Sequence, residues 1–316
     1  MRWRRLSALV CSRVATVTDQ AGLPLAGWRI GFAGLGLMGR PMALHLHAAG
    51  AGLRLWNRTR SVAEGLARPG LTPCDSPAEL GRQADVVVLM VADTAAVEQV
   101  LFGPGGLAEG LATGSLLIDM GTTAVMATRE FARRLAEHGV DYIDAPVSGG
   151  EIGAIDASLT IMAGGSDAAI DRAHPLLSVL GKQITHVGAV GAGQVAKAAN
   201  QIIVGLNIGA VAEALALVEA AGVDPAKVRR ALLGGFAGSR ILEVHGQRMI
   251  DGRFEPGARI TTQYKDMRQA VELGEALRQP LPATDLSRGL FEAMIEQGEG
   301  DLDHSALIRL LRRRRT

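Results

Sequence analysis

The stretch GFAGLGLMG, residues 31–39, most constrains what this chain can fold into. It places glycines in the spacing G-x-G-x-x-G, after an apolar strand-like run and before a helix-like run. In such a unit the first glycine permits a tight turn, the second admits a pyrophosphate, and the third lets helix and strand pack closely. Amides at the helix N-terminus then favour phosphate. This context favours a dinucleotide site over a purely structural turn, with predicted contacts at Gly34, Leu35, Gly36, Leu37, Met38 and Gly39.

Strand-like and helix-like patterns alternate after this motif. A continuous apolar run such as ADVVVLMV is typical of a strand covered on both faces. Alternation of this kind predicts a Rossmann-type, doubly wound parallel sheet. The expected strands are 28–34, 53–57, 84–91, 115–121 and 140–150, and the expected helices between them include 38–50, 59–67 and 128–139.

The pattern changes at Gly191-Ala192-Gly193. Beyond it we expect only helices, the first of them running from Gly193 to Ala221 over about 40 Å at 1.5 Å per residue. The sequence therefore predicts a cofactor-binding α/β domain over 28–190 and an all-α domain over 191–316. The acid-poor segment 1–27 is predicted to be a disordered extension, with a targeting segment as the alternative.

Composition excludes several classes of function. The formal net charge of +1 and an aromatic content of 3% argue against a nucleic-acid surface. Four arginines at 312–315 are explained by the dipole at a helix end. The only cysteines, Cys11 and Cys74, match no disulfide framework or metal spacing, so we expect a cytoplasmic protein with no metal. No apolar run approaches about 18 residues, so no membrane span is expected.

The end of the second expected strand suggests which nicotinamide cofactor binds. An NAD-preferring site places a carboxylate there for the ribose hydroxyls, but this chain has Asn57, Arg58 and Thr59. Arg58 and Thr59 are suited to hydrogen bonds with a 2′-phosphate. We therefore expect NADP(H) to be preferred, with NAD(H) possible if these residues form only a solvated loop.

Lysine is scarce in this chain, which makes Lys197 a candidate for chemistry. Arginine supplies 29 of the 33 basic residues, and only a desolvated lysine can lose its proton at useful pH. At helical spacing Lys197 shares a polar stripe with Gln194, Asn200 and Gln201. A helix start can also be polar simply because it is exposed, so the helix alone leaves both interpretations open.

Two further stretches favour a catalytic site. DAPVSGGEIGA offers the Ser148 hydroxyl and the amides of Gly149 and Gly150, which can converge on a substrate carboxylate. In QYKDMRQA, Lys265 precedes Asp266 on an expected helix. The alternative for that pair is a surface alternation of charge.

Taken together, the chain resembles the β-hydroxyacid dehydrogenase family over residues 29 to 308. The resemblance rests on GFAGLGLMGRPMA, DAPVSGGEIGA, GAGQVAKAAN and YKDM in the family's order. GGFAGSR and DHSAL resemble its tartronate semialdehyde reductase branch. The resemblance implies the following roles: Lys197 as catalytic residue; Ser148, Gly149, Gly150 and Asn200 as substrate-binding residues; Val91, Ala92, Thr122 and Lys265 as cofactor contacts.

Three positions depart from the family pattern. His45 replaces an asparagine, which is expected to change a local contact. Val62 replaces a lysine, which weakens the NADP(H) expectation unless Arg60 compensates. Ala157 replaces a glycine, a change expected to be structural only.

The resemblance implies reduction of a small 3-oxo acid by NAD(P)H, with Lys197 as general acid and base. The residues do not fix the substrate: tartronate semialdehyde, 3-hydroxyisobutyrate, succinic semialdehyde, glyoxylate and threonate-like acids remain open. An imine reductase and a non-catalytic cofactor-binding module are the alternatives, and the presence of Lys197 argues against both. The long helix, with Gly205 and Gly209 on one face, predicts a homodimer or homotetramer, although these glycines also suit simple core packing.

Overall fold

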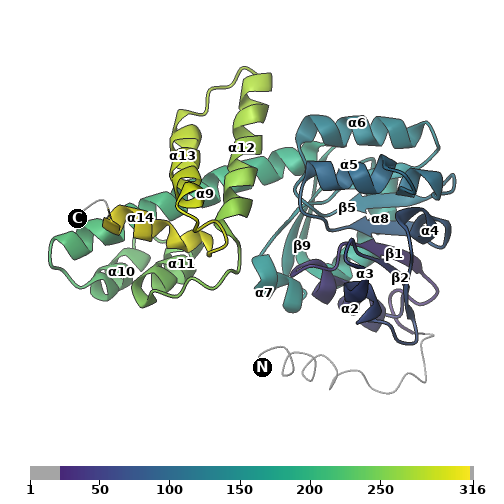
Figure 1. The fold of residues 1–316 in the computed structure, drawn as a ribbon, viewed down its shortest axis with the longest axis horizontal. Helices are drawn as coiled ribbons and strands as arrows, with labels where there is room; N and C mark the ends of the chain where they lie inside the picture. Colours follow the sequence, from purple (N-terminus) through teal and green to yellow (C-terminus); the bar gives the residue numbers. More distant parts are fainter. Residues whose placement is uncertain (1–21, 314–316) are drawn as a thin grey trace. The chain divides into compact units, whose positions relative to one another are not determined.

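The computed structural model describes residues 22–313, which form two compact units (Figure 1). The first unit runs to Thr123 and continues over Ala127–Gly193. The second contains Ala124–Met126 and the chain from Gln194 onward. Most of the expected extension over 1–27 lies outside the described residues. Of the part that is described, Leu25 is fully buried and its N–H donates to Ala49 O at 2.9 Å, so this part belongs to the first unit.

The first unit is built on one nine-stranded sheet of order β3-β2-β1-β4-β5-β6-β8-β7, with β9 paired to β8. Parallel pairing joins β3, β2, β1, β4, β5 and β6. The strands are β1 Arg29–Ala33, β2 Gly52–Trp56, β3 Leu71–Pro73, β4 Val86–Leu89, β5 Leu116–Asp119, β6 Asp141–Asp144, β7 Val147–Ser148, β8 Leu159–Gly164 and β9 Gly181–Gly188.

This topology confirms the predicted doubly wound fold, with one difference. Strand β8 runs antiparallel to β6 and β7, so the sheet is mixed at that end. The strands β3, β8 and β9 were not among those expected from the sequence. Strand β9 is mostly solvent-exposed, and it therefore lacks the continuous apolar run that reveals a buried strand.

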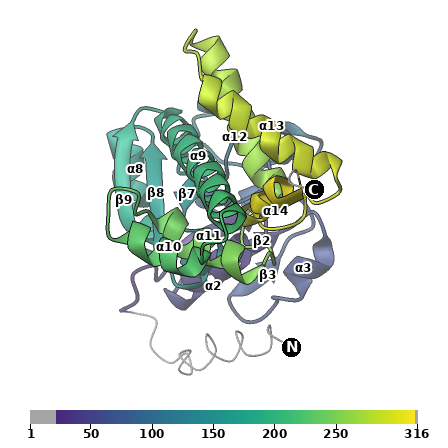
Figure 2. The same cartoon turned by 90° about the vertical axis from the view of Figure 1, so that its left-hand side faces the viewer.

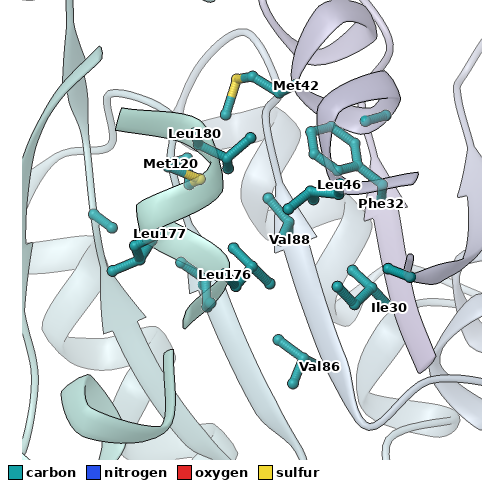
Figure 3. Packing of buried hydrophobic residues seen from close by; sticks show 14 of the residues in the cluster. Ile30, Phe32, Met42, Leu46, Val86, Val88, Met120, Leu176, Leu177 and Leu180 are labelled. Carbon is teal, nitrogen blue, oxygen red and sulfur yellow. The ribbon is translucent and has the colours of Figure 1, made fainter. Parts of the chain in front are cut away.

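Helices cover both faces of this sheet. On one face α2 and α8 pack on Ile30, Phe32 and Val88, as Figure 3 shows. On the other face α4, α5 and α6 pack on Val87 and Leu117. Successive side chains of a strand point to opposite faces, which explains why neighbouring apolar residues of β4 serve different layers. The helices are α2 Gly39–Ala48, α3 Arg60–Glu64, α4 Pro77–Arg82, α5 Thr94–Phe102, α6 Val125–Ala136, α7 Gly150–Ile155 and α8 Asp167–Leu180, with the short η1 Leu107–Glu109.

Beyond Gly188 the described residues form helices and no strand, which confirms the predicted all-α region (Figure 2). Its core contains Ile208, Leu215, Met249, Met267 and Phe291. Helices α12 and α13 lie side by side in both views. The elements are α9 Ala192–Ala220, α10 Pro225–Leu233, α11 Arg240–Asp251, α12 Ile260–Ala276, α13 Pro282–Glu296, η2 His304–Ala306 and α14 Leu307–Arg313.

Helix α9, 29 residues long, is the one helix in the described part of the chain whose length and apolar composition would permit a membrane span. Many core helices pass the same test. Gln194, Lys197 and Gln201 are buried along its first turns. Such polar groups are costly in lipid, so we regard α9 as a core helix.

The turn after α7 carries a strained residue. Ala157 has φ 48°, in the left-handed region that favours glycine. We expect Ala157→Gly to raise the free energy of unfolding by about 1 kcal/mol, because strain from the β-carbon outweighs the entropy that glycine adds to the unfolded chain. Urea unfolding of the variant beside wild type measures the change. A loss of stability would contradict the strain.

A buried carboxylate ties the C-terminal elements together. Asp303 accepts hydrogen bonds from the N–H groups of Gly257 at 3.0 Å and Ala258 at 3.2 Å and from Ser305 Oγ at 2.6 Å. Arg248 Nη1 lies 3.4 Å from the same carboxylate. His245, Asp303 and His304 have ligand-type atoms within 4.8 Å of one another. The guanidinium beside this carboxylate disfavours a divalent cation, so we interpret the cluster as structural.

Removing the charge of Asp303 should weaken this connection. We expect Asp303→Asn to lower the free energy of unfolding by about 2 kcal/mol at pH 7, since hydrogen bonds to a charged group contribute about 1.5–3 kcal/mol. Thermal and urea unfolding measure the loss. The exposed Asp301→Asn provides a matched control. An equal loss of unfolding free energy in the two variants would show that the Asp303 contacts stabilise the fold no more than an exposed carboxylate does.

The adjacent imidazole makes the fold sensitive to acid. Burial, followed by the charge of His245, lowers the pKa of His304 to about 3. The unfolded chain binds this proton below about pH 6.5, so stability should fall as the pH drops from 6.5 towards 3. We expect His304→Gln to reduce the slope of unfolding free energy against pH in this window. An unchanged slope would contradict the assignment.

The arginines at the C-terminus make internal contacts where they are described. Arg312 pairs with Glu219 across α9 and α14, and Arg313 pairs with Glu299. Arg314 and Arg315 lie outside the described residues.

Candidate active site

The carboxyl ends of three neighbouring strands bring the predicted cofactor residues of the first unit together. Ala33 of β1 pairs in register with Leu89 of β4, which in turn pairs with Asp119 of β5. In open α/β sheets, ligands bind outside these carboxyl ends. The glycine loop follows β1, Val91 and Ala92 follow β4, and Thr122 follows β5. A β-carbon built on Gly34 would lie 2.2 Å from Met90 O and 3.1 Å from Val91 Cγ1, so these loops touch.

The three glycines of the loop meet different surroundings. A β-carbon on Gly39 would lie 1.9 Å from Gly34 O, so this glycine is required for packing. Gly34 has φ 100°, which glycine adopts readily. Nothing lies within 4 Å of a β-carbon built on Gly36. This open approach fits a pyrophosphate against the backbone at Gly36, as the motif predicts.

Asn57 and Arg58 take different positions at the end of β2. Asn57 Oδ1 accepts the N–H of Leu35 at 3.0 Å, and Asn57 Nδ2 donates to Thr59 O at 3.0 Å. This side chain therefore supports the glycine loop, and the amide of Leu35 is already engaged. Arg58 and Thr59 are exposed. Arg58 forms no ion pair within residues 22–313.

Arg60 is already paired. Its Nε donates to Glu64 at 2.7 Å and its Nη1 to Asp75. The hydrogen bond that Arg60 donates to Glu64, followed by the one it donates to Asp75, raises the pKa of Arg60. Because both contacts fix the guanidinium on the first unit's own carboxylates, they argue against Arg60 compensating for Val62. Val62 itself packs against the apolar core.

The serine–glycine segment begins in β7 and leads into α7. Ser148 is half-buried, and Gly149 and Gly150 are exposed with φ 132° and 60°. These conformations are open to glycine and unfavourable for other residues. From α2, His45 Nε2 lies 2.8 Å from Ile155 O at the end of α7. The imidazole that replaces the family's asparagine thus connects the helix after the glycine loop to the helix after Ser148.

In the second unit, Lys197 belongs to a buried polar network between α9 and α12. Lys197 Nζ donates to Gln201 Oε1 at 3.3 Å, and Asn200 Nδ2 donates to the same oxygen at 2.7 Å. Gln201 Nε2 donates to Asp266 Oδ2 at 2.6 Å. Lys265 Nζ lies 3.1 Å from Asp266 Oδ1. The structure therefore brings Lys197, Asn200 and Lys265 together within this unit.

Close packing of the two helices allows this contact. A β-carbon on Gly205 would lie 2.5 Å from Met267 Sδ, so a larger residue would push α12 away. A β-carbon built on Gly209 would make only an ordinary contact, 3.7 Å from Ser287 Oγ. Within the second unit, Gly205 therefore serves core packing.

The environment lowers the pKa of Lys197 from its ordinary value. The residue is 7% exposed, and burial is the largest cause of its lowered pKa. The negative charge of Asp266 opposes this shift, whereas the positive charge of Lys265 adds to it. A buried lysine with a depressed pKa and a specific charge partner is typical of a functional site.

Asp266 is the residue of this network that the sequence interpretation undervalued. A surface alternation of charge was the alternative for Lys265 and Asp266, but Asp266 is only 3% exposed. Its spacing gave a usable signal. Asp266 follows the buried Gln263 by three residues and precedes the buried Ala270 by four, the spacing of one helix face.

In a comparison with known proteins, each half of the chain matches the model of a protein family. Residues 29–188 match the NAD binding domain of 6-phosphogluconate dehydrogenase. Residues 191–311 match the NAD-binding domain of NADP-dependent 3-hydroxyisobutyrate dehydrogenase. The chain is 46% identical over 283 residues to 2-hydroxy-3-oxopropionate reductase of Escherichia coli, covering 90% of this chain and 97% of that protein. The chain belongs to the 3-hydroxyisobutyrate dehydrogenase-like family.

Other relatives agree with this assignment. The chain is 34% identical to 2-(hydroxymethyl)glutarate dehydrogenase of Eubacterium barkeri, covering 89% of this chain and 94% of that protein. The structure of 3-hydroxyisobutyrate dehydrogenase from Mycobacterium tuberculosis with L-serine matches with a TM-score of 0.82 and 32% identity, covering 90% and 99% of the two chains. The chain is therefore an NAD(P)-dependent hydroxyacid dehydrogenase or reductase of the tartronate semialdehyde reductase branch.

Proposed function

We propose that this dehydrogenase reduces tartronate semialdehyde, or a similar small 3-oxo acid, to the hydroxy acid with Lys197 as general acid and base. The observation that carries the proposal is the buried Lys197 amine with its depressed pKa beside Asn200. The substrate class is supported by 46% identity to 2-hydroxy-3-oxopropionate reductase. Dehydrogenation of 3-hydroxyisobutyrate or another β-hydroxyacid is the second candidate, supported by the Mycobacterium tuberculosis structure.

Each proposed role follows from the chemistry of the residue. A nicotinamide cofactor, when bound, would supply the hydride that reduces the aldehyde carbon. Lys197, as ammonium, donates a proton to the carbonyl oxygen as negative charge develops there, and in the reverse direction the neutral amine takes it back. Burial makes that neutral form more accessible. Asn200 orients the substrate, while Ser148 Oγ and the amides of Gly149 and Gly150 bind its carboxylate.

The proposed cofactor contacts follow the strand ends described above. At those ends they comprise the glycine loop, Asn57, Val91, Ala92 and Thr122, with Asn57 acting through the loop. Lys265, on α12 of the second unit, is a further proposed contact. We further propose that NADP(H) is preferred because Arg58 and Thr59 are exposed where a carboxylate would bind the NAD ribose. NAD(H) remains usable. Arg58→Ala should raise the KM for NADPH and leave the KM for NADH unchanged.

We propose a homodimer or homotetramer that uses α9. Val195, Ile203 and Leu217 are exposed on this helix, and burial of such apolar side chains would favour association. Light scattering of the purified chain measures the assembly. A cytoplasmic location also stays a prediction.

The proposed function is tested with a panel of 3-oxo and 3-hydroxy acids, each with NADPH and with NADH, followed by nicotinamide absorbance. We expect the highest kcat/KM with tartronate semialdehyde among the reductions. A higher value with 3-hydroxyisobutyrate would favour the second candidate. Activity on cyclic imines with none on any acid would overturn the proposal. The imine reductases of Pseudomonas sp. and Streptomyces aurantiacus share the fold, at 21% and 23% identity.

A further inference from the structure

Gln201 occupies the centre of the buried network, and its contacts allow only one orientation of its amide. Lysine has donors only and an ionised carboxylate has acceptors only. The Lys197 ammonium must therefore face Gln201 Oε1, and Asp266 must face Gln201 Nε2. The distances agree, at 3.3 Å and 2.6 Å. Gln201 thus stands between the amine and the carboxylate as a fixed, neutral connection.

The surrounding groups hold this side chain in place. Gln201 Nε2 also lies 3.4 Å from Gln263 Oε1, and Gln263 Nε2 donates to the backbone oxygen of Gln201 at 3.2 Å. Gln201 itself is buried. A buried amide with partners on both ends loses them only at a cost, because each unpaired group costs about 1–3 kcal/mol.

We propose that Gln201 is a positioning residue that holds the Lys197 amine and links it to the Asp266 carboxylate on α12. The inference rests on the proposed role of Lys197. Gln201 does not act on the substrate in this scheme. It keeps the amine oriented and stabilises its charged form through the hydrogen bond to Oε1, while the bond from Nε2 to Asp266 polarises the amide in the same sense.

The protonation equilibrium of the Lys197 amine then depends on nearby charged groups in the second unit. Asp266 and Lys265 face it from α12, and His304 of η2 is within its electrostatic reach. Burial, which is the largest cause, lowers the pKa of Lys197, and Asp266 raises it. Gln201 provides the hydrogen-bonded path between that carboxylate and the amine.

Two substitutions of Gln201 should move the pKa of Lys197 in opposite directions. Gln201→Met keeps the length of the side chain but removes the acceptor, so the pKa should fall by about one unit. Gln201→Glu places a carboxylate against the amine, so the pKa should rise by about one unit. A purely structural residue would give the same loss of stability in both variants and no opposite shifts.

The measurement is feasible because the chain contains only the lysines Lys182, Lys197, Lys227 and Lys265. Titration of ¹³Cε-labelled lysine by NMR in the full cofactor-free chain reports each amine separately, and single Lys→Arg variants assign the signals. In parallel, the high-pH limb of kcat for reduction should shift down in Gln201→Met and up in Gln201→Glu. In Gln201→Met, kcat on this high-pH limb should fall by up to about 10-fold, the effect of a pKa lower by about one unit, with an unchanged KM for the cofactor.

Gln247→Met is the matched control, because Gln247 Nε2 also donates to an aspartate, Asp251 Oδ1 at 2.7 Å, on the exposed side of α11. It should leave the Lys197 signal unchanged. An unmoved Lys197 pKa in both Gln201 variants would overturn the inference. If the pKa moves as expected while Lys197→Met retains full turnover, the proposed function is wrong and the connection through Gln201 stands.

Discussion

Lys197→Ala is expected to lower kcat for reduction of the oxo acid by about 10²–10⁴-fold, the usual contribution of a positioned proton donor. The amine lies in a buried network of α9 and α12, where burial lowers its pKa. Alanine removes the donor and leaves the glycine loop of the first unit untouched. Cofactor affinity, measured by calorimetry with NADPH, should therefore remain within about twofold. Steady-state kinetics with saturating substrate measures the loss.

Lys227→Ala is the matched control for this prediction. Lys227 is an exposed lysine on α10, and its loss should leave kcat unchanged. Near-normal turnover of Lys197→Ala with intact NADPH binding would refute the general-acid role.

Gly36→Val is expected to weaken cofactor binding at least 100-fold, a loss of about 2.8 kcal/mol, without unfolding the chain. Apart from the adjacent residues, no atom lies within 4 Å of a β-carbon built at Gly36, so we expect the protein itself to tolerate a side chain there. The pyrophosphate is expected to approach the backbone at this position, and valine would exclude it. Calorimetric titration with NADPH and with NADH measures the affinity, and thermal unfolding without cofactor checks the fold.

Gly39→Ala provides the contrast. Its β-carbon would lie 1.9 Å from Gly34 O, so this smaller substitution should destabilise the first unit before any cofactor is added. Tight NADPH binding by Gly36→Val would show that the pyrophosphate does not pass this glycine.

The sequence predicted those parts of the fold that have a strong local signature. The run Val86–Leu89 is apolar throughout because both faces of its strand are covered, and its pattern identified β4. The glycine motif identified the turn between β1 and α2 in the same way. Strand β9 was not predicted because it is mostly exposed and its buried and exposed residues alternate only weakly. Its position depends on pairing with β8, which is a tertiary contact.

The same distinction applies to the site. Lys197 stood out because lysine is rare in this chain and because its neighbours at helical spacing are polar. The contact from Gln201 to Asp266 spans 65 residues along the chain. No local pattern encodes such a pairing, and it arises only when α9 and α12 pack. The role of Asp266 in this network could therefore be recognised only in the structure.

The bond between Asn57 Oδ1 and the Leu35 amide has a practical consequence for redesign of coenzyme choice. It connects the glycine loop to the end of β2, so a change at one is expected to disturb the other. An acidic residue introduced at position 57 to favour NADH would lack the amide that donates to Thr59 O. We expect this change to loosen the glycine loop that is proposed to bind the pyrophosphate. We expect changes confined to the exposed Arg58 and Thr59 to alter the preference between NADPH and NADH without disturbing the glycine loop.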